Sequence, residues 1–388
     1  MMPTAFDYIV VGLGATGSAS LYQLARRRAK VLGIDMFHPP HENGSSHGES
    51  RITRVSLGEG GHYVPLVRRS HEIWRELEAA TGENLLFQCG GLIFGSTRST
   101  NAAHGIEDFL QSTIDVARTH AVGHEILDAA ELGRRFPQFK FDTDDLGYFE
   151  PEAGFLKPEG CLRAQLSEAQ RMGATISTGN RVKAWHQHSG MVRLETDRGD
   201  YEAKQVLFAA GPWVSELVPQ LSPYARAYRQ VLYWFEQEGN AATFSPDKMP
   251  VYIRLPDAEN EMFYGFPLIG SQSSGLKIAG EQFDLACNPG ELERKVSETE
   301  IAAMFAKAAP KLRIRNQCLR AVTCQYTVTP DYQFLVDRLP GSDSVWVSSP
   351  CSGHGFKHSA AVGEAVAELM ISGATSYDMG QFGWRFPH

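Results

Sequence analysis

A glycine-rich turn near the start of the chain constrains the fold more than any other feature. Phe6 and the run Ile9–Val11 form an apolar, β-branched stretch that is typical of a strand buried on both faces of a parallel sheet. The G-x-G-x-x-G spacing follows at Gly12, Gly14 and Gly17. The first glycine permits a tight turn, the second lets a pyrophosphate approach the backbone, and the third lets the next helix pack closely on the strand. The N-terminus of that helix offers free N–H groups and a positive dipole end to a phosphate.

The residues after the turn complete a βαβ unit. Leu21, Leu24 and Ala25 give the expected helix an apolar face, and residues 31–34 predict a second strand. This strand ends at Asp35, about twenty residues past the glycines, where an acid can hold the hydroxyl pair of a ribose. An acid at this place argues against a 2′-phosphate, so FAD and NAD remain. The alternative is an ordinary βαβ unit with incidental glycines.

Composition limits the classes of partner. With 388 residues the chain is too long for one core, and 43% apolar with 21% charged residues is typical of a soluble globular protein. A net charge of -8 gives no support for nucleic-acid or membrane-surface binding, and no stretch is apolar enough to span a bilayer. None of the six cysteines forms a C-x-x-C pair, so no metal site is predicted. The first strand begins within a few residues of the N-terminus, which leaves no room for a signal peptide, and we expect a cytoplasmic protein.

Dinucleotide-type segments recur in the middle and at the end of the chain. An apolar strand over 206–210 runs into Gly211 just before a helix, which suits a second backbone approach to the dinucleotide, although a buried strand with a glycine turn explains it equally well. Gly353 and Gly355 lie in another glycine-rich turn that opens a final helix. Short aromatic strands between 224 and 276 predict an antiparallel sheet. A nucleotide domain assembled from separated pieces is typical of flavoproteins, so FAD is favoured over NAD.

We therefore expect an α/β fold of two domains (α+β in layout). The Rossmann-like FAD-binding domain is predicted from residues 1–85, 147–222 and 319–388, and an antiparallel-sheet substrate domain from 86–146 and 223–318. The long polar loop from His38 to Arg51 contains prolines and glycines that exclude a regular element, and its place beside a phosphate site favours a functional role.

With these segments identified, the chain resembles the monomeric sarcosine oxidase family of FAD-dependent amine oxidases. This group of the D-amino acid oxidase-like superfamily also contains N-methyltryptophan oxidase, pipecolate oxidase and the amadoriases. After the fingerprint, the resemblance is carried by Ser46–Arg54, Gly58–Gly60 with Tyr63–Pro65, Tyr264–Pro267 with Gly275–Lys277, Cys324–Thr327 with Thr329–Asp331, and Ser352–Lys357. It implies a monomer that oxidises a secondary or N-substituted amino acid. Hydride passes from the carbon beside nitrogen to flavin N5, the imine hydrolyses, and O₂ becomes H₂O₂.

The resemblance also implies roles for single residues. Cys324 matches the cysteine that attaches the flavin 8α carbon, and Lys277 matches the lysine that activates oxygen. A buried free thiol and a surface lysine are the respective alternatives. Arg54 and Lys357 match the pair that binds the substrate carboxylate, and Arg51 matches a residue against the flavin ring.

Further matches complete the expected site. His47 matches another residue against the flavin, and Tyr264 and Tyr326 match active-site tyrosines, with core packing as the alternative for the tyrosines. The expected cofactor-binding residues are Gly12, Gly14, Ala15, Thr16, Gly17, Asp35, Ser46, Arg51, Gly211, Cys324, Gly353, Gly355, Phe356 and Lys357. The expected catalytic residues are Lys277, Arg54, Lys357, Tyr264, Arg51 and His47.

Three departures from the family pattern concern the substrate. Glu281 stands where sarcosine oxidase has an active-site histidine, Leu57 replaces a tyrosine, and Arg254 stands near the place of an acid. Arg254 could bind a second carboxylate, as in iminodiacetate, or pair with Glu281 or another acid and touch no substrate. The expected substrate-binding residues are Arg54, Lys357, Tyr264, Arg254, Glu281 and Tyr326.

Other functions remain open at this point. A flavin dehydrogenase that passes electrons to a carrier other than O₂ would carry the same fingerprint, and Lys277 argues for O₂ instead. An NAD-dependent dehydrogenase is disfavoured by the interrupted nucleotide domain and by Cys324. A non-catalytic flavin-binding protein is disfavoured by the charged residues in the matched motifs.

Overall fold

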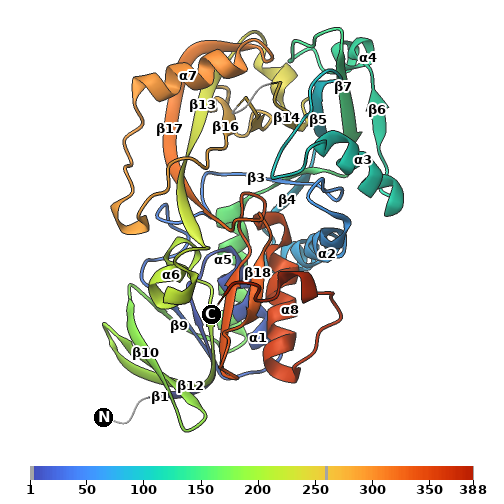
Figure 1. Cartoon of the computed structure of the whole chain (residues 1–388). Coiled ribbons are helices and arrows are strands. Elements are labelled where there is room, and N and C mark those ends of the chain that lie inside the picture. Colours follow the sequence, from blue (N-terminus) through green and yellow to red (C-terminus); the bar gives the residue numbers. More distant parts are fainter. Residues whose placement is uncertain (1–3, 258–260, 388) are drawn as a thin grey trace.

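The computed structural model describes residues 4–257 and 261–387, and its first sheet is built around the N-terminal strand (Figure 1). The strand β1 lies between β2 and β12 and is parallel to both, as the βαβ pattern predicts. The order is β10-β11-β12-β1-β2-β9, with β19 also on β12 and β18 on β19. The bounds are β1 Thr4–Val11, β2 Val31–Asp35, β9 Thr175–Thr178, β10 Val182–His188, β11 Met191–Thr196, β12 Gly199–Phe208, β18 Leu335–Arg338 and β19 Val345–Ser349.

Strands from the beginning, middle and end of the chain therefore share this sheet, which confirms a Rossmann-like domain made of separated segments. The helices that cover it pack closely where small residues meet. A Cβ at Gly363 of α8 would lie 2.4 Å from the Cβ of Ala19 of α1. These helices are α1 Ala15–Arg26, α2 Val64–Thr81, α5 Pro158–Arg171, α6 Val214–Leu217 and α8 Ser359–Ser372.

A second sheet forms the opposite end of the molecule, where α7, β13 and β17 lie in Figure 1. Its order is β17-β13-β16-β15-β14-β5-β7-β6. The antiparallel prediction holds except that β5 and β14 are parallel, because these strands come from distant segments rather than from one hairpin. The bounds are β5 Gly91–Ser96, β6 Glu125–Leu127, β7 Asp145–Glu150, β13 Arg226–Gln237, β14 Val251–Arg254, β15 Phe263–Gly265, β16 Leu276–Gly280 and β17 Ile314–Val328.

Helices beside the second sheet begin directly after residues whose side chains cap them. Asp128 accepts a hydrogen bond from the Glu131 N–H at the start of α4, Ala129–Arg135. Ser297 and Glu300 form a capping box that starts α7, Glu298–Ala308. Asp108 accepts a hydrogen bond from the Gln111 N–H at the start of α3, Phe109–Thr119.

The parts of the chain that form the two sheets are linked by strands and by a small third sheet. The strand β17 crosses the boundary expected at residue 319, and pairs with β13 from Ile314 to Val328. The boundary expected at residue 147 lies inside β7. The small sheet has the order β3-β8-β4, with β3 Arg51–Thr53, β8 Gly154–Leu156 and β4 Leu86–Gln88. The residue bounds of the two domains stay a prediction. None of the described helices has both the length and the apolar character needed to cross a membrane.

Candidate active site

The glycine-rich turn after β1 has the geometry that a dinucleotide requires. Gly12 has a φ of +89°, and a Cβ there would lie 2.5 Å from the carbonyl oxygen of Ala209. A Cβ at Gly17 would lie 1.7 Å from the Gly12 carbonyl oxygen, so only glycine lets the helix pack so closely. At Gly14 the nearest atom is the Ser46 Oγ at 3.7 Å, and the second glycine therefore faces open space.

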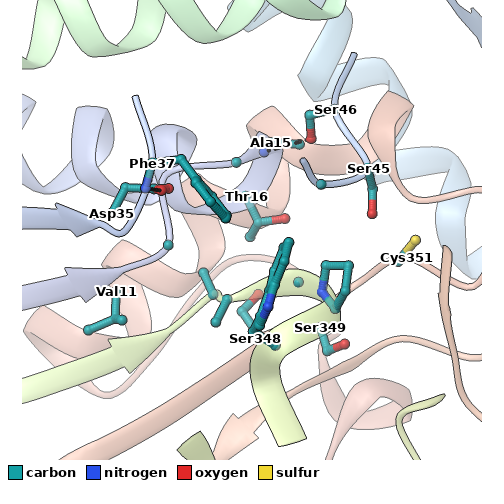
Figure 2. A pocket seen from close by; sticks show the side chains of 18 of the residues that line it. Val11, Ala15, Thr16, Asp35, Phe37, Ser45, Ser46, Ser348, Ser349 and Cys351 are labelled. Atoms are coloured by element: carbon teal, nitrogen blue, oxygen red, sulfur yellow. Dashed lines mark hydrogen bonds between the residues drawn. The ribbon is translucent and has the colours of Figure 1, made fainter. Parts of the chain in front are cut away.

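A first cavity opens beside this turn and runs along the carboxyl ends of the parallel strands. Asp35 accepts hydrogen bonds from the N–H groups of Leu13 at 2.8 Å and Phe37 at 2.7 Å. Burial raises the pKa of this carboxyl group, while the two N–H groups act in the opposite direction. Figure 2 shows Asp35 and Cys351 at opposite ends of the residues drawn, with Thr16 between them. Asp35 and the glycine-rich turn thus line one cavity, as the binding of a single dinucleotide requires.

Most of the expected cofactor-binding residues line this cavity. They are Gly12, Gly14, Ala15, Thr16, Asp35, Ser46, Arg51, Gly211, Gly353, Gly355 and Phe356. Gly17 contributes through packing of α1, and Cys324 and Lys357 do not line it. Phe37 and Trp213, which the sequence did not predict as site residues, also line this cavity, and their rings meet edge to face with centres 5.5 Å apart. Trp213 follows Gly211 and Pro212 directly, so its position beside the expected turn was the available signal.

A second cavity meets the first one and extends towards the second sheet. Both are lined by Arg51, Tyr326, Gly353 and Phe356. The second cavity is further lined by Ile52, Arg54, Glu59, Ala103, His104, Phe109, Ile253, Met262, Tyr264, Glu281, His354 and Lys357. The hydroxyls of Tyr264 and Tyr326 are hydrogen-bonded at 2.8 Å. A planar group at the junction would thus touch a ligand in the second cavity.

Charged side chains form a connected network in the second cavity. Nη2 of Arg54 lies 3.0 and 3.3 Å from the two carboxylate oxygens of Glu59. His104 Nδ1 lies 3.2 Å from Glu59 Oε1, and its Nε2 lies 2.8 Å from Glu281 Oε2. Lys357 donates a hydrogen bond to the carbonyl oxygen of His354 at 2.6 Å. The structure therefore joins Arg54 to Glu281 through Glu59 and His104.

Burial and these partners determine which groups are charged. Burial raises the pKa of Glu59, but Arg54 and His104 outweigh it and hold that pKa well below its usual range. Burial lowers the pKa of His104, yet its contacts with Glu281 and Glu59 raise it to about 10. Burial lowers the pKa of Lys357 to about 7, with Glu59 opposing and Arg54 adding to that effect. His104 is thus a cation at neutral pH, and Lys357 titrates there.

Lys277 lies behind the loop that carries Ser46. Its ammonium donates hydrogen bonds to the carbonyl oxygens of Gly48 at 2.6 Å and Ser50 at 2.7 Å, and lies 4.5 Å from the centre of the Phe266 ring. Burial and the nearby Arg51 lower the pKa of Lys277 well below its usual value. Lys277 lines neither cavity. The loop that accepts its hydrogen bonds lies between its ammonium and the junction of the two cavities.

Cys324 is fully buried in β17 and also lies behind the same loop. Its Sγ is 3.7 Å from Arg51 Nη2 and 3.8 Å from the Ser45 carbonyl oxygen. Burial raises the pKa of the thiol, and Arg51 and Lys277 act in the opposite direction. His47 is buried nearby, and neither of its ring nitrogens has a hydrogen-bond partner among the described residues. Burial and the adjacent cations lower the pKa of His47 to about 3, so this ring is neutral.

Among the expected substrate-binding residues, Arg254 is the one that does not line the second cavity. Side chains alternate along β14, so Ile253 lines the cavity and Arg254 does not. The guanidinium of Arg254 is hydrogen-bonded to Asp257. Glu281 pairs with His104 instead of with Arg254.

The sequence did not predict the roles of Glu59 and His104. Glu59 lies in the Gly58–Gly60 motif, which carried the resemblance without a stated function. His104 lies in the irregular segment between β5 and α3, where no spacing links it to Glu59 or Glu281.

Comparisons with known proteins identify the family of this chain. Residues 7–369 match the protein family described as FAD dependent oxidoreductase (DAO). The chain is 38% identical to monomeric sarcosine oxidase from Streptomyces avermitilis over 98% of this chain and 97% of that one. It is 34% identical to monomeric sarcosine oxidase from Bacillus sp. over 98% of this chain and 96% of that one. It is 33% identical to N-methyl-L-tryptophan oxidase from Yersinia pestis over 97% and 98%.

Solved structures show the same fold. The open form of a Tyr258Phe mutant of NikD, an amino acid oxidase of nikkomycin biosynthesis, superposes with a TM-score of 0.86 at 23% identity, covering 99% of this chain and 98% of that one. Glycine oxidase from Geobacillus kaustophilus superposes with a TM-score of 0.76 at 19% identity, covering 98% of each chain. The full-length identities above 30% carry the assignment: the chain belongs to the FAD-dependent oxidoreductase family, within the group of amine oxidases that contains monomeric sarcosine oxidase and N-methyl-L-tryptophan oxidase.

Proposed function

We propose that this protein is an FAD-dependent oxidase of a small secondary, N-substituted amino acid, with O₂ as the electron acceptor and H₂O₂ as a product. The observation that carries the proposal is the meeting of a dinucleotide cavity with a second cavity that holds Arg54 and Lys357. Relatives at 31–38% identity are named as oxidases of sarcosine and N-methyl-L-tryptophan, which are both N-methyl amino acids.

The residues of the first cavity fit FAD. Gly12, Gly14 and the start of α1 would hold the pyrophosphate, and Asp35 would hold the ribose of the adenosine part. Arg51 and Tyr326 would contact the ring system at the junction of the two cavities. When bound, FAD supplies the two-electron oxidation of a C–N bond.

Covalent attachment through Cys324 is part of this proposal. In its support, the Cys324 Sγ is 3.8 Å from the carbonyl oxygen of Ser45, which lines the first cavity. The guanidinium of Arg51 lies 3.7 Å from the same sulfur and favours its thiolate, which is the reactive form.

The second cavity suits a substrate with one carboxylate. Arg54 and His104 carry positive charge, Lys357 is partly protonated near neutral pH, and Glu59 and Glu281 supply two carboxylates. Protonated Lys357, and Arg51 at the junction of the two cavities, carry positive charge that neither glutamate balances, and a substrate carboxylate beside Arg54 and Lys357 neutralises the charge of Lys357. Apolar side chains on the other wall, including Ile253 and Met262, exclude water from the reacting carbon.

Lys277 is proposed as the residue that favours O₂ as acceptor. Its ammonium would stabilise negative charge that develops on oxygen, because a fixed charge in a dry site acts strongly. Its depressed pKa works against a permanent charge, so this role requires that the ammonium form persists beside the bound cofactor. We further propose that the enzyme is a monomer, in keeping with the names of the sarcosine oxidase relatives, and that it is cytoplasmic.

The decisive experiment is anaerobic reduction of the flavin in the purified holoenzyme. Sarcosine, N-methyltryptophan, pipecolate, iminodiacetate, a fructosyl amino acid and the matching primary amino acids are each mixed with enzyme, and flavin bleaching is followed. Rapid bleaching by a secondary amine supports the proposal, whereas no bleaching by any amine contradicts it. Peroxide yield after air is admitted separates the oxidase from a dehydrogenase that uses another carrier, for which peroxide would be far below one equivalent.

A further inference from the structure

A carboxylate oxygen of Glu281 faces the substrate cavity without a partner. Its Oε2 is bonded to His104 Nε2 at 2.8 Å, but its Oε1 accepts no hydrogen bond from the residues that the structure describes. The side chain of Glu281 is only 8% exposed. Because Glu281 lines the second cavity, this oxygen is open to the cavity, and a hydrogen-bond donor of a bound ligand can reach it.

Gly353 keeps the space in front of this oxygen open. A Cβ at Gly353 would lie 2.9 Å from Glu281 Oε1 and 3.6 Å from Tyr326 Cδ2. Both Gly353 and Tyr326 line the two cavities, so Oε1 lies at their junction. The C–N bond that is oxidised must also lie at this junction, next to the cofactor.

Arg54 and Lys357 line the same cavity as Glu281 and offer a binding site for a carboxylate. Arg54 and Lys357 bind the carboxylate of the substrate under the proposed function, and the nitrogen of an α-amino acid is two bonds from that carboxylate. Glu281 acts on Lys357 electrostatically, which puts the two within one cavity rather than in separate sites. A ligand held at its carboxylate can therefore present its N–H to Glu281.

We propose that Glu281 recognises the N–H of the substrate amine and that His104 is the positioning residue that holds and balances the Glu281 carboxylate. This inference rests on the proposed function and names its substrate class: an amino acid with a hydrogen-bearing nitrogen, bound at two points. His104 is fixed from both sides, by Glu281 and by Glu59 at 3.2 Å, so it holds the carboxylate in one orientation.

The test compares an amine with its ether analogue. Sarcosine and methoxyacetate share the carboxylate and the methyl group, but the ether has no N–H. Dissociation constants are measured on the holoenzyme, from the saturation of anaerobic flavin reduction for sarcosine and from perturbation of the flavin spectrum for methoxyacetate. If another amine of the panel reduces the flavin faster, that amine and its own ether analogue replace this pair.

Glu281→Gln is expected to weaken amine binding by about tenfold to a hundredfold, the value of a hydrogen bond to a charged group, while ether binding stays within about twofold. The matched control is Glu195→Gln, which makes the same change in a Glu–His pair on the exposed β10–β11 hairpin, and both ligands should bind it as they bind the wild type. Equal weakening of amine and ether in Glu281→Gln, or no weakening of either, overturns the inference.

His104 is tested by conservative rescue. His104→Gln keeps an N–H that can reach Glu281 and should retain most of the preference for the amine, whereas His104→Leu should lose it. If both variants keep the wild-type preference, His104 does not position Glu281. Failure of every amine to reduce the wild-type flavin would instead contradict the proposed function itself, so the two failures are distinguishable.

Discussion

Carboxylate binding should depend on pH through Lys357. Burial lowers the pKa of this lysine to about 7, so about half of it carries a proton at neutral pH. Above that pH each further unit removes about nine-tenths of the remaining ammonium. A deprotonated Lys357 no longer offers a charge to the ligand carboxylate, and binding should weaken as the pH rises.

The size of the effect follows from the contact that is lost. A hydrogen bond to a charged group contributes about 1.5–3 kcal/mol, which corresponds to about a tenfold to hundredfold change in Kd. The Kd of methoxyacetate should therefore rise by about that factor between about pH 6 and about pH 9. Bound carboxylate raises the pKa of Lys357 in turn, so the rise should level off once the ammonium is lost in the complex as well.

Methoxyacetate is the suitable ligand because it has no nitrogen that titrates. His104, with a pKa of about 10, and His354, with a pKa of about 3, keep their charge states over this range. Kd is measured at each pH by flavin perturbation or by calorimetry of the holoenzyme. Lys357→Arg is the matched control, because a guanidinium stays protonated and should give a flat profile. A flat wild-type profile, or an equally steep one in Lys357→Arg, refutes the reasoning.

Three further variants test the other proposed roles. Lys277→Met should slow reoxidation of the reduced flavin by about a hundredfold or more while reduction slows far less, as measured by stopped flow, and equal slowing of both steps would exclude a role with oxygen. Cys324→Ser should leave flavin that acid precipitation releases, whereas wild-type protein should precipitate yellow; a colourless wild-type pellet contradicts covalent attachment. Arg254→Ala should change kcat/KM for iminodiacetate and sarcosine by the same factor, since Arg254 pairs with Asp257 and lines neither cavity, and a selective loss with the diacid would contradict this.

The nucleotide-binding part of the fold could be predicted well from the sequence because the contacts that determine it are local. The roles of Gly12 and Gly17 depend on backbone contacts within a few residues or across one strand pair. The place of Asp35 follows from the length of one helix and one strand. The parallel pairing of β5 with β14 was not predictable in this way, because about 160 residues separate strands that local patterns treat independently.

The substrate site was predicted less completely for a related reason. Period-two alternation places Ile253 and Arg254 on opposite faces of β14, but it does not say which face lines a cavity. Glu59, His104 and Glu281 come from three distant segments, and no sequence spacing predicts that they contact one another. The family resemblance predicted that Arg54 and Lys357 bind the substrate carboxylate, but it did not predict which side chains pair with them.

Those pairs change what the cavity can select. Arg254 alone suggested a site for a second carboxylate, yet Arg254 pairs with Asp257, and Arg54 and His104 in the second cavity are already opposed by Glu59 and Glu281. A ligand with one carboxylate neutralises the charge of Lys357, and a second carboxylate at the place of the amine would meet the carboxylate of Glu281. Repulsion between the two carboxylates would weaken binding of a diacid, whereas a hydrogen bond from an amine N–H to Glu281 would strengthen binding of an amino acid. The arrangement thus favours a monocarboxylate whose polar atom next to the acid is a nitrogen that bears hydrogen.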